Sequence, residues 1–169
     1  MALLACTTSP AEDTHTASPD SGGDEDPCAA HTVTCELPGG GDVDAAATRQ
    51  YTLTLTPLTW SGDIDEPGES SGFASLDDGG VLSWSAAPGG TLLIVEESDE
   101  GFYADATTSV DGGTTDGCTM DGTLHWVIGG RWTGDGGFAG TWTLSAYLRV
   151  GESSCSYSVT YSAVASPPG

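Results

Sequence analysis

Apolar and polar residues alternate with a period of two along most of this chain after residue 50. Leu53 and Leu55 alternate with threonines, and over residues 138–150 an apolar side chain occupies almost every second position. This pattern is typical of β-strands that pack one face against a core and turn the other to water. The chain is therefore expected to be all-β.

The alternating runs predict about eight short strands, separated by turns that are mostly rich in glycine. The connections are mostly short enough for hairpins, as at residues 77–80, which favours an antiparallel meander. A flat sheet of this length would leave its apolar face uncovered, so we expect closure into a barrel, with a two-sheet sandwich as the alternative. The expected strands are residues 51–56, 73–76, 81–86, 91–96, 101–108, 120–128, 138–150 and 157–163.

The 169 residues are expected to hold one folded domain. Residues 6–27 are rich in Thr, Ser, Pro, Asp, Glu and Gly, a composition that buries too little apolar surface to offset ordering entropy. We expect a disordered acidic tether there, then a small disulfide loop and Gly-rich linker at 28–49. The β domain is expected at 50–165, with a short tail at 166–169.

Charge narrows the range of partners. The chain has 25 Asp and Glu against three Arg and no Lys, a net charge of −22. Binding to nucleic acid needs cationic side chains that replace counterions on phosphates, so we expect no nucleic-acid partner. Acidity this strong is compatible both with solubility at a crowded surface and with a salt-rich habitat.

The first cysteine gives a prediction of cellular location. Leu3, Leu4, Ala5 and Cys6 resemble a bacterial lipobox, in which the cysteine is lipidated and becomes the new N-terminus. The resemblance implies export and a lipid anchor at Cys6 in the bacterial cell envelope, at the outer membrane or cell surface. Residues 1–5 are then the remnant of a signal peptide whose upstream part is missing.

The other four cysteines form an even set and predict two disulfides in an oxidising compartment. The simplest pairing joins Cys28 to Cys35 and Cys118 to Cys155, although four cysteines allow three pairings. In a flat meander Cys118 and Cys155 lie two strands apart, about 10 Å, whereas a disulfide needs Cα atoms within about 7 Å. The sheet must then curl strongly, or Cys118 must lie in a loop. Zinc at Cys28, His31 and Cys35 is the weaker alternative.

Five tryptophans divide into two groups. Three of them, at 84, 126 and 142, are in phase with apolar neighbours and are expected in the core. Trp60 and Trp132 lie beside polar residues near turns. Exposed tryptophans can stack on sugars or anchor a protein, so these two are candidate residues for binding a protein or carbohydrate partner.

A cluster of acids follows Trp60. Asp63, Asp65, Glu66 and Glu69 resemble the oxygen-rich groups that bind calcium, but they do not complete an EF-hand. They are therefore weak calcium candidates, and no other metal or cofactor is expected.

Catalytic motifs are weak. Residues 68–72 match the G-x-S-x-G pattern, but that motif needs a strand-to-helix turn, and no helix follows here. His125 has the opposite parity to its apolar neighbours and is expected to face solvent. We therefore expect no enzyme activity, and a secreted hydrolase is a disfavoured alternative; a cytosolic acidic protein with free cysteines is weaker still.

Gly140, Thr141 and Trp142 resemble the Gly-x-Trp motif of lipocalins. That resemblance implies a barrel that carries a small ligand, although in lipocalins the motif lies on the first strand and here it is near the end. The favoured function is that of a membrane-anchored extracytoplasmic lipoprotein whose non-catalytic β domain has a binding or structural role. A lipocalin-like carrier is the main alternative.

Overall fold

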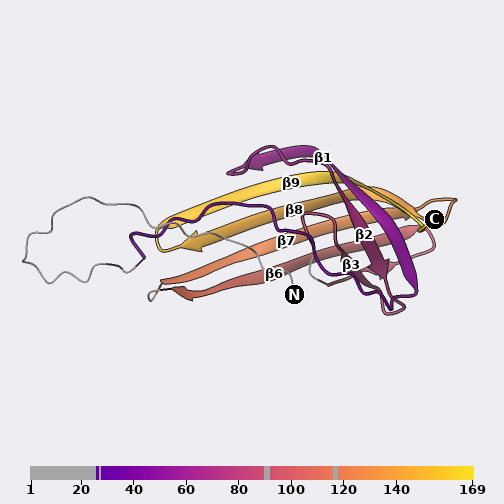
Figure 1. Cartoon of the computed structure of the whole chain (residues 1–169), viewed down its shortest axis with the longest axis horizontal. Coiled ribbons are helices and arrows are strands. Elements are labelled where there is room, and N and C mark those ends of the chain that lie inside the picture. Colours follow the sequence, from indigo (N-terminus) through magenta and orange to yellow (C-terminus); the bar gives the residue numbers. More distant parts are fainter. Residues whose placement is uncertain (1–25, 27, 90–91, 116–117) are drawn as a thin grey trace, which may run out of the picture.

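One antiparallel sheet of nine strands forms the body of the protein (Figure 1). The computed structural model describes residue 26 and residues 28–89, 92–115 and 118–169. Within these residues there is no helix. The strands are β1 (Arg49–Gly62), β2 (Ser70–Leu76), β3 (Val81–Trp84), β4 (Leu93–Ile94), β5 (Glu96–Glu97), β6 (Gly101–Thr115), β7 (Cys118–Trp132), β8 (Phe138–Val150) and β9 (Ser153–Ser166).

The first long strand pairs with the last, which bends the meander into a nearly closed barrel. The order across the sheet is β4-β3-β2-β1-β9-β8-β7-β6-β5, so the two edge strands are neighbours in the chain. Leu93 pairs with β3 and Glu96 pairs with β6, on either side of the buried residue Val95. One short segment therefore connects the two edges of the sheet. The predicted all-β barrel is confirmed, and the strand expected at 91–96 is divided into β4 and β5.

The strand register confirms the predicted alternation of inward and outward positions. Trp126 lies opposite Leu144, and Trp142 lies between Ile128 and Tyr161. Directly opposed residues share a face, so these positions all point into the barrel. The largest fully buried side chains are Trp84, Trp126, Trp142, Tyr161, Phe138, Leu53, Leu55, Leu76, Leu82, Ile128, Leu144 and Leu148.

Aromatic rings fill the middle of the barrel. The Trp84 ring centroid lies 5.1 Å from that of Trp126 and 5.0 Å from that of Trp142, both in edge-on geometry. Phe138 extends the cluster, with its centroid 4.9 Å from Phe102 and 6.1 Å from Trp142. Edge-to-face contacts at these distances are the favoured arrangement of aromatic pairs. The prediction that Trp84, Trp126 and Trp142 form the core is confirmed.

The strands differ in length, so the barrel is complete at one end only. β6 to β9 have 13 to 15 residues, whereas β2 has seven and pairs only with the first half of β1. The segment that starts at Cys28 runs along the long strands before β1 begins (Figure 1). Its Val33 and Leu37 pack against the core, and the Tyr157 hydroxyl donates a hydrogen bond to the Glu36 carbonyl at 3.2 Å. This segment therefore covers the inner face where the short strands do not reach.

Two disulfides attach this segment to the sheet, and the expected pairing of the cysteines was wrong. Cys28 bonds to Cys118 and Cys35 bonds to Cys155, with Cα atoms 5.1 and 5.7 Å apart. Cys118 and Cys155 both face inward, but β8 lies between their strands. Since the sheet does not curl enough to join them, each instead bonds to the segment that lies over it.

Candidate functional site

The second half of β1 carries the candidate residue Trp60. Before Trp60, the register with β9 shifts. Pro57 lies opposite Tyr161, and Thr59, two residues later, lies opposite the adjacent residue Thr160. Leu58 is therefore the extra residue of a β-bulge. Beyond this point β1 pairs with β9 alone, since its pairing with β2 ends at Leu55.

Trp60 and Leu58 expose apolar surface at this open part of the barrel. Trp60 lies opposite Val159, whose side chain is fully buried, so both belong to the inner face. Even so, Trp60 is 41% exposed and Leu58 is 52% exposed, because β2 does not extend far enough to cover them. We call Leu58 and Trp60 the β1 patch.

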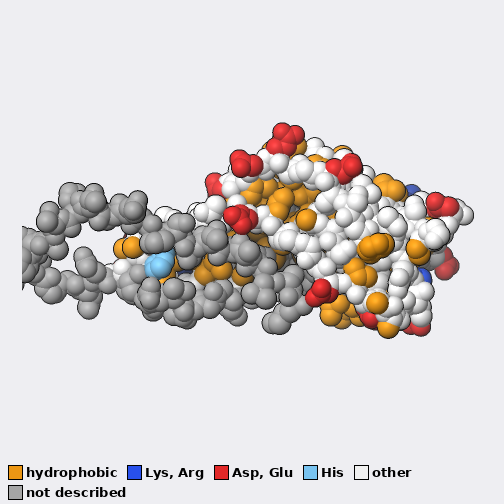
Figure 2. Space-filling view, in the orientation of Figure 1, with side chains coloured by type: hydrophobic (Ala, Val, Ile, Leu, Met, Phe, Trp, Pro, Cys, Tyr) orange, Lys and Arg blue, Asp and Glu red, His pale blue; other side chains and the backbone are white. Residues whose placement is uncertain are grey.

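The loop after β1 places acids around this patch, and we call residues 63–69 the acidic loop. Asp63 accepts a hydrogen bond from the Ser156 backbone amide at 2.8 Å, which holds the loop at the far end of β1. Glu69 accepts one from the Thr56 hydroxyl at 2.9 Å, which holds it before the bulge. The loop therefore returns along the stretch that carries the β1 patch. Asp65 and Glu66 are exposed. Figure 2 shows apolar side chains bordered by acidic ones on the side where Figure 1 labels β1.

The acidic loop does not assemble into a metal site in this structure. Among the described residues, no group of three or more His, Cys, Asp or Glu side chains is placed to hold a metal ion. Asp63 and Glu69 are held at opposite ends of the loop by Ser156 and Thr56. The calcium candidates thus gain no support from geometry.

Trp132 is the last residue of β7 and lies near Arg49, the first residue of β1. It is therefore not part of the β1 patch. Its indole N–H donates to the Ser98 carbonyl at 2.9 Å, and the Arg49 guanidinium carbon lies 5.8 Å from its ring centroid. Arg49 in turn binds both carboxylate oxygens of Glu97, at 2.7 and 2.8 Å. This hydrogen bond raises the pKa of Arg49 and lowers the pKa of Glu97. Trp132 therefore supports a clamp between β1 and β5.

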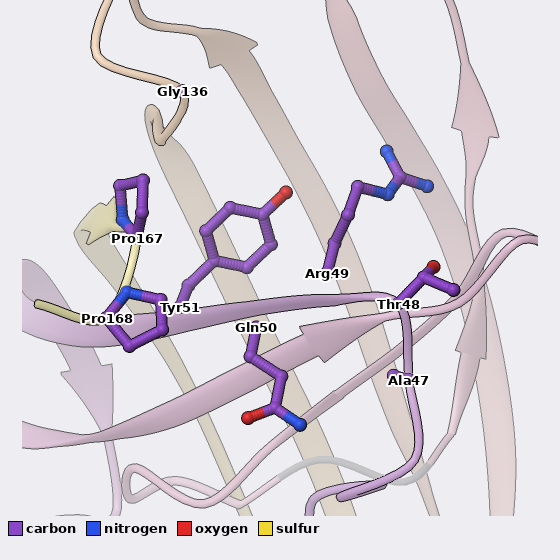
Figure 3. A pocket seen from close by; sticks show the side chains of 8 residues that line it. All are labelled: Ala47, Thr48, Arg49, Gln50, Tyr51, Gly136, Pro167 and Pro168. Carbon is purple, nitrogen blue, oxygen red and sulfur yellow. The ribbon is translucent and has the colours of Figure 1, made fainter.

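A shallow depression of about 510 Å³ lies beside this clamp (Figure 3). Pro167 and Pro168 line one side and Arg49 the other, with Tyr51 between them. The Gln50 amide, also in its wall, donates to the Ala45 carbonyl at 2.8 Å. The depression presents mainly ring surfaces, together with the Arg49 and Gln50 side chains, which already have hydrogen-bond partners.

Ser70 of the G-x-S-x-G pattern and His125 lie on β2 and β7, which are not neighbours in the sheet. Ser70 is the first residue of β2, and its hydroxyl donates a hydrogen bond to the Ala87 carbonyl. His125 lies on the outer face of β7, where its Nε2 is 2.7 Å from an Asp105 carboxylate oxygen. The prediction that His125 faces solvent is confirmed.

Leu58 is a site residue that sequence reasoning missed, although the chain carries a signal for it. Leu53, Leu55 and Pro57 share odd parity, whereas Leu58 and Trp60 are at even positions. A change of parity inside one strand is what an inserted residue produces, because side chains alternate strictly between faces. The parity change at Pro57 thus marks the bulge.

None of the described residues belongs to a helix with the length and apolar character needed to cross a membrane. Comparisons with protein-family models, curated proteins and solved structures find no match to this chain. The function of the site therefore has to be inferred from its own residues.

Proposed function

We propose that this protein is an extracytoplasmic lipoprotein of the bacterial cell envelope, at the outer membrane or cell surface, whose β domain is a non-catalytic binding module. The anchor is a lipid on Cys6, which lies outside the described residues, as does nearly all of the tether at 6–27. The module binds a macromolecular partner through solvent-exposed side chains rather than in an internal cavity.

The observation that carries this proposal is the pair of disulfides. They join residues separated by 90 and 120 positions in the chain, and both tie the segment after the tether to the inner face of the sheet. Each bridge alone is worth roughly 4.5–5 kcal/mol by the chain-entropy relation. Bridges of this kind persist in oxidising compartments and are rare in the cytosol, so they support export.

The filled interior favours binding at the surface over carriage of a small ligand. A lipocalin-like carrier needs a cavity, whereas in this barrel the rings of Trp84, Trp126, Trp142 and Phe138 contact one another at the centre. The hydrolase alternative gains no observation either, because the Ser70 hydroxyl is bonded to a backbone carbonyl.

The test is the intact mass of the protein purified from its native membrane, with and without reductant. A chain that begins at Cys6, carries acyl mass and gains two hydrogens for each of two disulfides on reduction is expected. The matched control is Cys6→Ser, which should leave both disulfides intact and release the protein from the membrane fraction. An unmodified Cys6 with free thiols elsewhere would refute the proposal.

Digestion with trypsin before reduction adds a test of the pairing. The three arginines, Arg49, Arg131 and Arg149, divide the chain so that Cys28 and Cys35 share one fragment while Cys118 and Cys155 lie on two others. The observed pairing links all three fragments into one species. The pairing of neighbours along the chain would instead leave the first fragment unlinked.

A further inference from the structure

We propose that the β1 patch and the acidic loop together bind a cationic amphipathic segment of a protein partner. An apolar side chain of that segment packs on Leu58 and Trp60, and its Lys or Arg side chains meet the carboxylates of Asp65 and Glu66. The inference rests on the proposed binding function and names the site and the kind of partner.

The apolar half of the site follows from the bulge. By register Trp60 belongs to the inner face, yet it is 41% exposed, because β2 stops short of it. A tryptophan supplies a large and rigid contact surface, and such residues dominate the energy of protein interfaces. The backbone beneath it is held by pairing with β9, so little ordering is needed when a partner binds.

The acidic half follows from the two hydrogen bonds that hold the loop beside the patch. Asp63 and Glu69 are bonded at its ends, while Asp65 and Glu66 between them are exposed. None of the seven loop residues is Lys or Arg. An apolar surface next to uncompensated carboxylates is complementary to a segment that carries cations beside an apolar anchor.

Charge also disfavours the other occupants. The tether at 6–27 has acids and no Lys or Arg, so the loop repels it. A second copy of the chain brings a net charge of −22, and two of its three arginines, Arg49 and Arg149, are already paired with Glu97 and Asp121. A neutral sugar could stack on Trp60, but it carries no positive charge and so would not relieve the repulsion among the carboxylates of the acidic loop.

The probe is a short synthetic peptide of alternating Lys and Leu, titrated by calorimetry into the full chain with its disulfides intact. We expect a Kd of roughly 10 µM at low salt. Trp60→Ala should weaken binding by about tenfold or more, and Leu58→Ala by a smaller factor. The matched control is Phe73→Ala, which removes an aromatic side chain that is 61% exposed on the outer face of β2 and should leave the Kd unchanged.

A second pair of variants tests the charge. Asp65→Asn combined with Glu66→Gln should weaken binding by about threefold to tenfold and flatten its dependence on salt. Asp99→Asn combined with Glu100→Gln removes the same charge from the turn between β5 and β6 and should have little effect. The near-ultraviolet circular dichroism of the buried tryptophans checks that each variant is folded.

Four results would overturn this inference, and the first three concern the binding experiments. They are equal losses in Trp60→Ala and Phe73→Ala, equal losses in the two charge variants, and binding of a neutral glucan oligosaccharide at Trp60 without binding of the peptide. Self-association that Trp60→Ala abolishes would also overturn it. None of these results bears on the lipid at Cys6 or on the disulfides, so failure here is distinguishable from failure of the proposed function.

Discussion

Tyr161 and Trp142 each place a polar atom in the barrel interior without a partner. They lie opposite each other on β9 and β8, and both are fully buried. In the described part of the chain, the Tyr161 hydroxyl and the Trp142 indole N–H find no hydrogen-bond acceptor or donor. Burial raises the pKa of Tyr161 to about 12. An unpaired buried polar group costs free energy. These two atoms therefore destabilise the folded state, whereas burial of their rings stabilises it.

We predict that Tyr161→Phe changes the free energy of unfolding by less than about 1 kcal/mol, because it removes a hydroxyl that has no partner among the described residues. The comparison is Tyr157→Phe on the same strand, which deletes the hydrogen bond to Glu36 and should cost roughly 1 kcal/mol. Urea unfolding followed by tryptophan fluorescence, with the disulfides intact, measures both. A cost for Tyr161→Phe as large as that for Tyr157→Phe would mean that the Tyr161 hydroxyl has a partner, such as a buried water.

The two halves of β1 have different neighbours and different roles in the fold. The first half begins with the Arg49–Glu97 clamp, which ties it to β5, and lies between β2 and β9. The second half has only β9 as a neighbour and carries the bulge. One strand therefore closes the barrel at one end and exposes the candidate site at the other.

We predict that Glu97→Gln lowers the free energy of unfolding at pH 7 by at most about 1 kcal/mol, since both side chains of the clamp are partly exposed. The Arg49 guanidinium lowers the pKa of Glu97 from its usual 4.5. The stabilisation is therefore complete above pH 4.5 and is lost as the pH falls through the lower pKa of the folded state.

Thermal unfolding of the wild type and Glu97→Gln across pH 3–7 measures this effect. The control is Asp121→Asn, which breaks the more exposed pair with Arg149 and should change stability little. A difference between wild type and Glu97→Gln that stays constant below pH 4.5 would contradict the assignment.

In the whole molecule, charge is distributed unevenly. β1, β8 and β9, which are neighbours in the sheet, contain no Asp or Glu. The described acids lie in loops, in the segment before β1, and on β5 to β7. The outer face of the three acid-free strands instead carries Thr and Ser, such as the Thr143–Thr160 and Ser145–Ser158 pairs. Repulsion among acids is thereby kept away from the centre of the sheet.

We predict that added NaCl raises the melting temperature, because a net charge of −22 destabilises the compact state and salt screens it. Most of the gain should come below about 0.3 M, where the screening length falls fastest. Calorimetric scans at several salt concentrations measure it, and the same scans near pH 4 serve as the control, since protonated acids need less screening. A melting temperature that falls with salt at pH 7 would contradict this view.

The alternation of apolar and polar residues along the chain was enough to assign the side chains that face the core. Trp84, Trp126, Trp142 and the outward His125 could be placed because alternation is a local property of each strand, and the need to cover the apolar face implied closure. The exposed Trp60 and its neighbouring acids could also be recognised as candidates from their local context.

The cysteine pairing and the different environments of Trp60 and Trp132 could not be read from the sequence. Both depend on contacts between residues far apart in the chain. Cys118 and Cys155 face the same way, but β8 keeps them apart, and the segment from Cys28 to Cys35 lies over both. Trp132 is half-buried, and its ring and indole N–H are engaged by Arg49 and Ser98, which approach it from other strands and turns. Local alternation fixes the face of each residue, whereas its partners depend on how distant segments pack.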